Sequence, residues 1–196
     1  MKNTVTLSAL CAAFLFTLVS CGTQSNQDDS KEVAEEQNEQ KFEESDLEDD
    51  TDFAVKAADG GMLEVQLAEL ALTKASSPKV KEFAQMMITD HTKANDELKN
   101  LAQSKNISLP TALSEENQKD YNDLAEKSGP DFDKAYCDFM VKDHKDDLEE
   151  FKKAADDSKD PDLKSWAAGK VTVLEHHLSM AEDMDKAIES TSDASN

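Results

Sequence analysis

Apolar and small side chains recur every three or four positions in four long stretches of the chain, which is the period of a helix with one buried face. No stretch shows the period of two that a half-buried strand requires. The pattern therefore predicts an all-α domain over residues 52–190. Long helices are expected at residues 52–75, 78–103, 130–159 and 161–188, with a short polar helix at 114–128.

An internal repeat relates the two halves of this domain. Residues 87–91 (Met-Ile-Thr-Asp-His) align with residues 140–144 (Met-Val-Lys-Asp-His) at an offset of 53 residues. Each half holds two long helices, so the repeat predicts two helical hairpins that form a four-helix bundle with a crossover connection. A solenoid of stacked repeats is the alternative, but two units fall short of the roughly three that such arrays need.

The first 20 residues have the pattern of a signal peptide. Lys2 precedes an apolar stretch over residues 5–19, which is too short for a typical membrane-spanning helix. The stretch ends in Leu-Val-Ser before Cys21 and resembles the bacterial lipoprotein signal, in which a lipid is attached to the cysteine. An ordinary secretory signal, or a core strand that happens to end in cysteine, is the alternative.

We therefore expect residues 1–20 to be removed and Cys21 to be acylated, so that the membrane is a partner through the lipid anchor. Gly22 stands where a lipoprotein retained at the inner membrane would carry Asp, which favours the outer membrane of the cell envelope.

The segment that follows Cys21 is strongly acidic. Residues 22–51 carry twelve acids and two lysines with few apolar side chains, too few to offset the entropy of ordering. We expect residues 21–51 to be the acylated cysteine with a disordered acidic tether, and residues 191–196 to be a disordered tail. A partner-binding tail is the alternative for the acidic segment.

Charge and missing motifs exclude several classes of function. The chain has 43 acids, 21 lysines and no arginine, for a net charge of −22, so nucleic acid is not an expected partner. No Gly-rich phosphate loop, paired cysteine motif, nucleophile elbow or zinc-protease motif occurs. A familiar enzyme is therefore not expected.

One polar group recurs on the apolar faces of the long helices. Glu64, His91, His144 and His177 each fall on the buried face of a different predicted helix. Histidine and carboxylate side chains suit Zn, Fe, Mn or Cu, so these four are candidate ligands of a divalent transition metal. A buried Glu–His hydrogen-bond network without metal is the alternative. The acids next to two of the histidines are candidate orienting groups or further ligands, namely Asp90 and Asp143.

Counting residues from the turns predicts how these side chains are placed along the bundle. Glu64 lies 13 residues before Ser77 and His91 lies 14 after it, so both stand about 20 Å from that turn. His144 lies 16 residues before Asp160 and His177 lies 17 after it, which places both at about 25 Å. Each hairpin thus pairs its two side chains in height. The count does not fix one hairpin against the other.

Several motifs resemble the bacterial domain of unknown function 4142 family. They include Gly-Met-Leu-Glu-Val at 61–65, Asp-His-Thr-Lys-Ala-Asn at 90–95 and Phe-Asp-Lys-Ala-Tyr at 132–136, and the resemblance covers about residues 52–188. The family is similar to the ferritin-like superfamily of four-helix bundles and is often found on exported envelope proteins. The resemblance therefore implies a fold and a location, and no activity.

The chain departs from the ferritin pattern at one point. Ferritins place Glu three residues before a metal-binding His, whereas Ile88, Val141 and Leu174 stand at these positions here. Di-iron oxidase chemistry is therefore not expected. The sequence predicts a metal-binding envelope lipoprotein, with a metal-free helical interaction or structural module as the alternative.

Overall fold

The computed structural model describes residues 29–193, which form six helices and contain no strand. The predicted all-α class is therefore confirmed. The helices, in chain order, are α1 (Ser30–Phe42), α2 (Glu48–Lys74), α3 (Pro78–Lys105), α4 (Glu115–Ala125), α5 (Gly129–Asp157) and α6 (Pro161–Asp193). The last five lie where the apolar period predicted helices, and α1 has no counterpart in the prediction.

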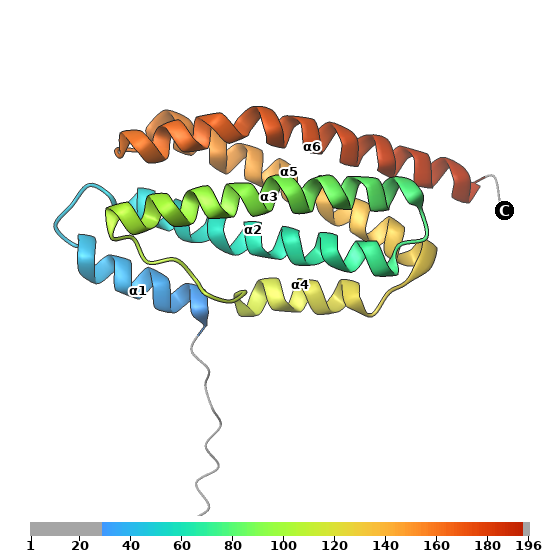
Figure 1. Cartoon of the computed structure of the whole chain (residues 1–196), viewed down its shortest axis with the longest axis horizontal. Helices are drawn as coiled ribbons and strands as arrows, with labels where there is room; N and C mark the ends of the chain where they lie inside the picture. Colours follow the sequence, from blue (N-terminus) through green and yellow to red (C-terminus); the bar gives the residue numbers. More distant parts are fainter. Residues whose placement is uncertain (1–28, 194–196) are drawn as a thin grey trace, which may run out of the picture.

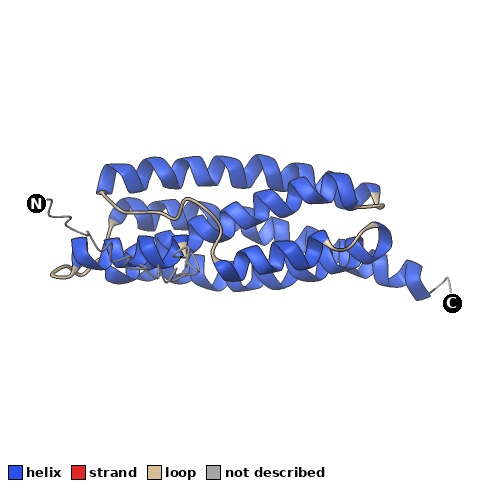
Figure 2. Cartoon of the chain, turned by 90° about the horizontal axis from the view of Figure 1, so that it is seen from below, coloured by secondary structure: helices blue, strands red, loops and turns tan. Residues whose placement is uncertain are grey.

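The four long helices lie side by side as two antiparallel hairpins (Figure 1). α2 packs along α3 and α5 packs along α6, while the hairpins meet through α2 against α5 and α3 against α6. The connection from α3 to α5 runs through α4, and both α4 and α1 pack on α2. A view turned by 90° shows the long helices following a common axis (Figure 2). This topology of two hairpins joined by a long connection agrees with the internal repeat.

The apolar core consists of two clusters that follow each other along the bundle. One cluster contains Phe83, Phe132 and Tyr136 near the turn between α2 and α3. The other contains Phe53 and Phe151 near the turn between α5 and α6. Burial of each large side chain contributes roughly 1.5–3 kcal/mol, so these clusters dominate the stability of the fold.

Two buried carboxylates tie the hairpins together at opposite ends of the bundle. Asp133 on α5 accepts hydrogen bonds from the backbone N–H groups of Ser76 and Ser77, at 3.0 and 2.9 Å, where α3 begins. Asp50 on α2 accepts from the backbone N–H groups of Lys159 and Asp160, with shortest distances of 3.0 and 2.6 Å. These contacts fix the height of one hairpin against the other, which the residue count left open.

The acidic segment before the bundle differs from the prediction. Residues 30–42 form helix α1, and residues 48–51 belong to α2, where a disordered tether was predicted. Asn38 explains why helix α1 forms. Its buried amide accepts a hydrogen bond from the N–H of Ser108 at 2.7 Å and donates one to the Ser108 carbonyl at 2.9 Å. Asp29 caps the helix through the N–H of Lys31. The bundle therefore includes residues before 52.

At the C-terminal end of the domain, helix α6 is longer than the sequence predicted. Residues 191–193 continue α6, although the sequence predicted a disordered tail from residue 191. The predicted signal peptide and the lipidated Cys21 lie outside the described residues. Within residues 29–193, no helix combines the length and the hydropathy that a membrane-spanning segment needs.

Candidate metal centre

The four candidate ligands come from four different helices and meet inside the bundle. Glu64 lies on α2, His91 on α3, His144 on α5 and His177 on α6, and all four side chains are buried. On each helix the apolar cluster residues stand on both sides of the polar one, so the face that packs the core also turns this side chain inward. The four side chains share one level, between the two apolar clusters.

Short distances connect the side chains across the helices. His91 Nδ1 lies 2.6 Å from Glu64 Oε2, which confirms the pairing in height within the first hairpin. The rings of His144 and His177 lie 5.5 Å apart, which confirms it in the second. The hairpins also meet each other, because His91 Nε2 lies 3.2 Å from His177 Nδ1 and His144 Nε2 lies 3.5 Å from Glu64 Oε1.

Two of the histidines each form a hydrogen bond to a carboxylate through one ring nitrogen. Carboxylate oxygens accept hydrogen bonds, so His91 donates its Nδ1–H to Glu64 and His177 donates its Nε2–H to Asp90 at 3.0 Å. The other nitrogens, His91 Nε2 and His177 Nδ1, then face each other at 3.2 Å. Asp90 therefore orients His177, as its position next to His91 suggested that it would orient an imidazole.

His144 is held by the backbone and leaves its other nitrogen unpaired. Its Nδ1–H donates to the Met140 carbonyl at 3.1 Å, one turn earlier on α5. Its Nε2 has no hydrogen-bond partner within the described residues, and neither does Glu64 Oε1 or Asp143 Oδ2, although all three atoms are buried. Unpaired buried polar atoms are costly, so a group of three at one place calls for a ligand.

Two overlapping sets of these residues have the spacing of metal ligands. His91, His144 and His177 each offer one nitrogen, and the three atoms lie within 4.8 Å of one another. Glu64, Asp143 and His144 form a second set by the same measure. The structure thus brings both predicted acids, Asp90 and Asp143, to the cluster of Glu64 and the histidines.

Burial and mutual charge set the protonation of the centre. Burial lowers the pKa of His144 to about 4, so this imidazole is neutral at pH 7 and its Nε2 carries a lone pair. Burial alone would raise the pKa of Glu64, but the charge and hydrogen bond of His91 outweigh it and keep the pKa low. Burial, reinforced by the charge of Glu64, raises the pKa of both Asp143 and Asp147 well above the ordinary value.

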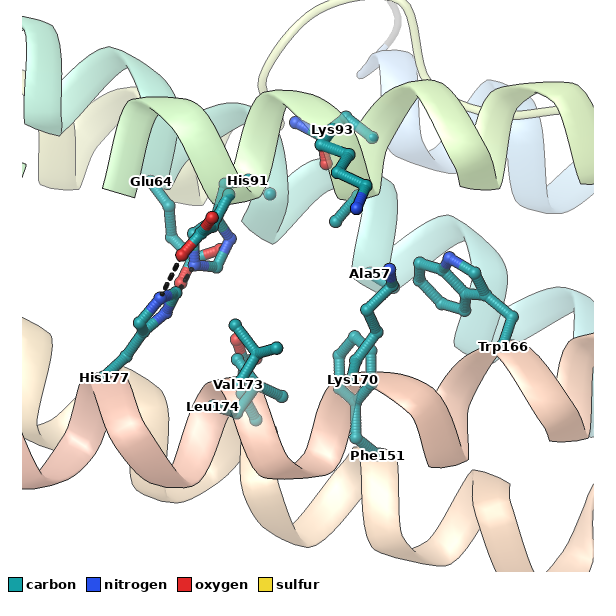
Figure 3. Close-up of a pocket in the computed structure, with 15 residues that line it drawn as sticks. Ala57, Glu64, His91, Lys93, Phe151, Trp166, Lys170, Val173, Leu174 and His177 are labelled. Atoms are coloured by element: carbon teal, nitrogen blue, oxygen red, sulfur yellow. Dashed lines mark hydrogen bonds and ion pairs between the residues drawn. The ribbon is translucent and has the colours of Figure 1, made fainter. Parts of the chain in front are cut away.

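The candidate residues drawn from the sequence do not include Asp147, and the cavity beside the centre was not predicted. The apolar period places Asp147 on the inward face of α5 with His144, one position from Leu148, but it is not among the candidate ligands. The cavity has a volume of about 100 Å³ and extends from the cluster along α6 (Figure 3). Its polar lining residues are Glu64, Asp90, His91, Lys93, Asn95, Asp147, Lys170 and His177.

Comparisons with known proteins agree with the helical fold. The family described as "Domain of unknown function (DUF4142)" matches residues 32–184, a range that begins inside α1. The structure is similar to a solved one described as "CopM in the Cu(I)-bound form", with a TM-score of 0.61 and 19% identity over 70% of this chain and 96% of that chain. A likeness at this identity concerns the fold. A search of curated proteins found no match.

Proposed function

This chain belongs to the DUF4142 family, and we propose that it binds a transition-metal ion in the core of its helical bundle. The observation that carries the proposal is the arrangement of the three histidines. Each donates one ring N–H to a carboxylate or a backbone carbonyl, and one nitrogen of each lies within 4.8 Å of the others. Metal-binding histidines have this pattern, because the outer hydrogen bond fixes the ring and makes the inner nitrogen a better ligand.

The distances between the free atoms fit a metal ion. Two ligand atoms that each lie about 2.05 Å from a tetrahedral ion are about 3.3 Å apart. His91 Nε2 and His177 Nδ1 are 3.2 Å apart, and His144 Nε2 and Glu64 Oε1 are 3.5 Å apart. An ion would satisfy the unpaired His144 Nε2 and Glu64 Oε1 and would bind the two histidine nitrogens that face each other.

The donor set narrows the class of metal. Imidazole and carboxylate ligands suit Zn, Fe, Mn or Cu. Among residues 29–193 no thiolate joins this donor set, because Cys137 belongs to the apolar cluster near the turn between α2 and α3. Copper is the first ion to test, since the similar solved structure is described as Cu(I)-bound. The packing of the four long helices also supports the proposed metal site, because bundles with a ferritin-like arrangement commonly hold a metal between facing helices.

The alternative is a metal-free helical module whose polar core has a structural or interaction role. The contacts that run from Glu64 through His91 and His177 to Asp90 favour it, since the two carboxylates already hold these histidines in place without an ion. It leaves His144 Nε2 and Glu64 Oε1 unpaired, however. This difference makes the metal site the better account of the geometry.

We further propose that the protein acts at the cell envelope, where a lipid on Cys21 would anchor it to the outer membrane. Each CH₂ group buried in the bilayer contributes roughly 0.8 kcal/mol to such an anchor. The test is fractionation of wild type and Cys21→Ala. The variant is expected as a soluble or unprocessed form, and a mature-sized Cys21→Ala in the membrane fraction would contradict lipidation.

Elemental analysis and titration of untagged protein test the metal site. We expect one equivalent of ion bound by wild type and a strong loss of affinity in His144→Ala. His176→Ala is the matched control, because His176 is exposed beside His177. Bound metal should also raise the thermal midpoint of wild type but not of His144→Ala. Equal midpoints with and without Zn, Fe, Mn and Cu in both proteins would leave the hydrogen-bond network alone.

A further inference from the structure

Asp147 is a half-buried acid beside the metal centre and is not one of the proposed ligands. It lies on α5, one turn after Asp143, and lines the cavity beside the centre. Among the described residues it makes no hydrogen bond and no ion pair, whereas its neighbour Asp146 pairs with Lys142 at 2.8 Å. The carboxyl oxygens of Asp147 can therefore contact a ligand that enters the cavity.

The cavity connects the surface with the buried cluster. At its outer end lie Lys93 and Val173, whose exposed fractions are 75% for the lysine side chain and 38% for the valine. At its inner end lie Glu64 and His177, which are 1% and 0% exposed. Figure 3 shows Glu64, His91 and His177 grouped at one end, with Val173 between them and Lys170. An ion that reaches the histidines from solvent has this opening available.

The volume of the cavity suits an ion better than an organic substrate. The cavity holds about 100 Å³, and each water in the liquid occupies roughly 30 Å³, so about three water molecules fit. Pockets for drug-sized ligands are several times larger, at roughly 300–1,000 Å³. A transition-metal ion with part of its water shell has the appropriate size.

The charges along the cavity favour a cation. Glu64 and Asp90 contribute carboxylates to the lining, and Asp147 contributes the oxygens of a carboxyl group whose pKa is raised by burial. The two lysines of the lining, Lys93 and Lys170, both lie beside Glu97, whose charge offsets theirs. Clefts lined by one sign of charge concentrate ions of the other sign and raise association rates.

We propose that this cavity is the path by which the metal ion reaches the three histidines, and that the carboxyl group of Asp147 is the oxygen donor that the ion contacts on the way. This inference rests on the proposed metal site and adds a role for a residue outside the ligand set. In this role Asp147 governs how fast the ion arrives, while the histidines and Glu64 govern how long it stays.

Stopped-flow fluorescence with CuCl₂ as the probe tests the path. Trp166 is the one tryptophan of the sequence and lines the cavity, so quenching of its emission by Cu²⁺ reports arrival of the ion. We compare Asp147→Asn with Asp146→Asn, which makes the same substitution at an exposed position one residue away. Asp147→Asn is expected to lower the association rate constant about three- to tenfold, because an amide is a weaker oxygen donor to the ion, with a dissociation rate within about twofold of wild type.

A second pair of variants tests the path by size instead of by donor chemistry. Val173→Phe fills the opening, whereas Thr172→Phe adds the same ring at an exposed position outside the lining. A blocked path slows association and dissociation by the same factor, so Val173→Phe should reduce both rates several-fold at an unchanged dissociation constant. Thr172→Phe should change neither rate.

The outcomes of these experiments distinguish a failure of the proposed entry path from a failure of the proposed metal site. Wild type that shows no saturable quenching by Cu²⁺, together with no bound metal by elemental analysis, would overturn the proposed function and the path with it. Saturable binding with equal association rates in both Asp variants, or in both Phe variants, would overturn the path and leave the site. A faster dissociation in Asp147→Asn with unchanged association would make Asp147 a ligand, which also contradicts the path.

Discussion

His144 Nε2 lies 3.5 Å from Glu64 Oε1 in the centre of the bundle, and neither atom has a hydrogen-bond partner among the described residues. The other atoms of both groups are occupied, because His144 Nδ1 binds the Met140 carbonyl and Glu64 Oε2 binds His91. Two unpaired acceptors that face each other repel unless a cation or a proton lies between them. The contact therefore needs a third partner, and the proposed metal ion would supply it.

Removing the charge of Glu64 while keeping its shape should weaken metal binding. Glu64→Gln is expected to reduce affinity about 10- to 100-fold, because the carboxylate both faces the site and orients His91. Isothermal titration of untagged protein measures the change. Glu69→Gln, on the exposed side of the same helix, is the matched control. Equal affinities in the two variants would show that Glu64 is not part of the metal centre.

The stability of the metal-free protein should depend on His144 in mild acid. Burial lowers the pKa of His144 from 6.5 to about 4 in the folded state. Between these values the unfolded chain binds a proton that the folded chain does not, so the stabilisation present above pH ~6.5 is lost as the pH falls toward ~4. The difference corresponds to about 3 kcal/mol, at roughly 1.4 kcal/mol for each pKa unit.

Urea denaturation with a chelator at pH 7 and at pH 4 checks this dependence. The free energy of unfolding of wild type should fall by about 3 kcal/mol relative to that of His144→Gln, which has no group that titrates in this range. A constant difference between the two proteins across this range would mean that His144 is protonated in the fold.

Asp50 should stabilise the bundle by joining the hairpins. Asp50→Asn is expected to cost about 1–3 kcal/mol, because the backbone N–H groups of Lys159 and Asp160 lose a carboxylate acceptor. Chemical denaturation measures the cost, with Asp49→Asn as the exposed control on the same helix. Equal losses of stability in the two variants would show that Asp50 does not stabilise the bundle by joining the hairpins.

Helix α1 should belong to the folding unit of the bundle. A chain that starts at residue 29 is expected to fold fully, whereas one that starts at residue 47 should lose at least about 2 kcal/mol of stability, since it lacks both hydrogen bonds between Asn38 and Ser108. Denaturation of the two chains in urea makes the comparison. Equal urea midpoints of the two chains would show that residues 29–46 do not belong to the folding unit and act only as a tether.

The sequence predicted the parts of the structure that depend on local spacing. The period of apolar residues placed the long helices, and the count from Ser77 and from Asp160 paired Glu64 with His91 and His144 with His177 in height. A helix has a fixed rise per residue, so distances along one hairpin follow from the chain alone.

The remaining features depend on contacts between distant residues. The relative height of the hairpins follows from Asp133 and Asp50, whose partners lie 57 and up to 110 positions away. Helix α1 is ordered by Asn38 through a contact 70 positions away, although its composition is that of a disordered segment. Nothing in the local sequence distinguishes these three side chains from the many other polar residues.

Anomalous X-ray diffraction from crystals of the untagged protein loaded with Cu or Zn tests the central claim most directly, because it locates the ion. The account predicts one strong peak inside the bundle, bonded to His91 Nε2, His144 Nε2 and His177 Nδ1 at about 2.0–2.1 Å, with Glu64 in contact. A peak only at surface carboxylates, or no peak from protein that titration shows to be loaded, would contradict it.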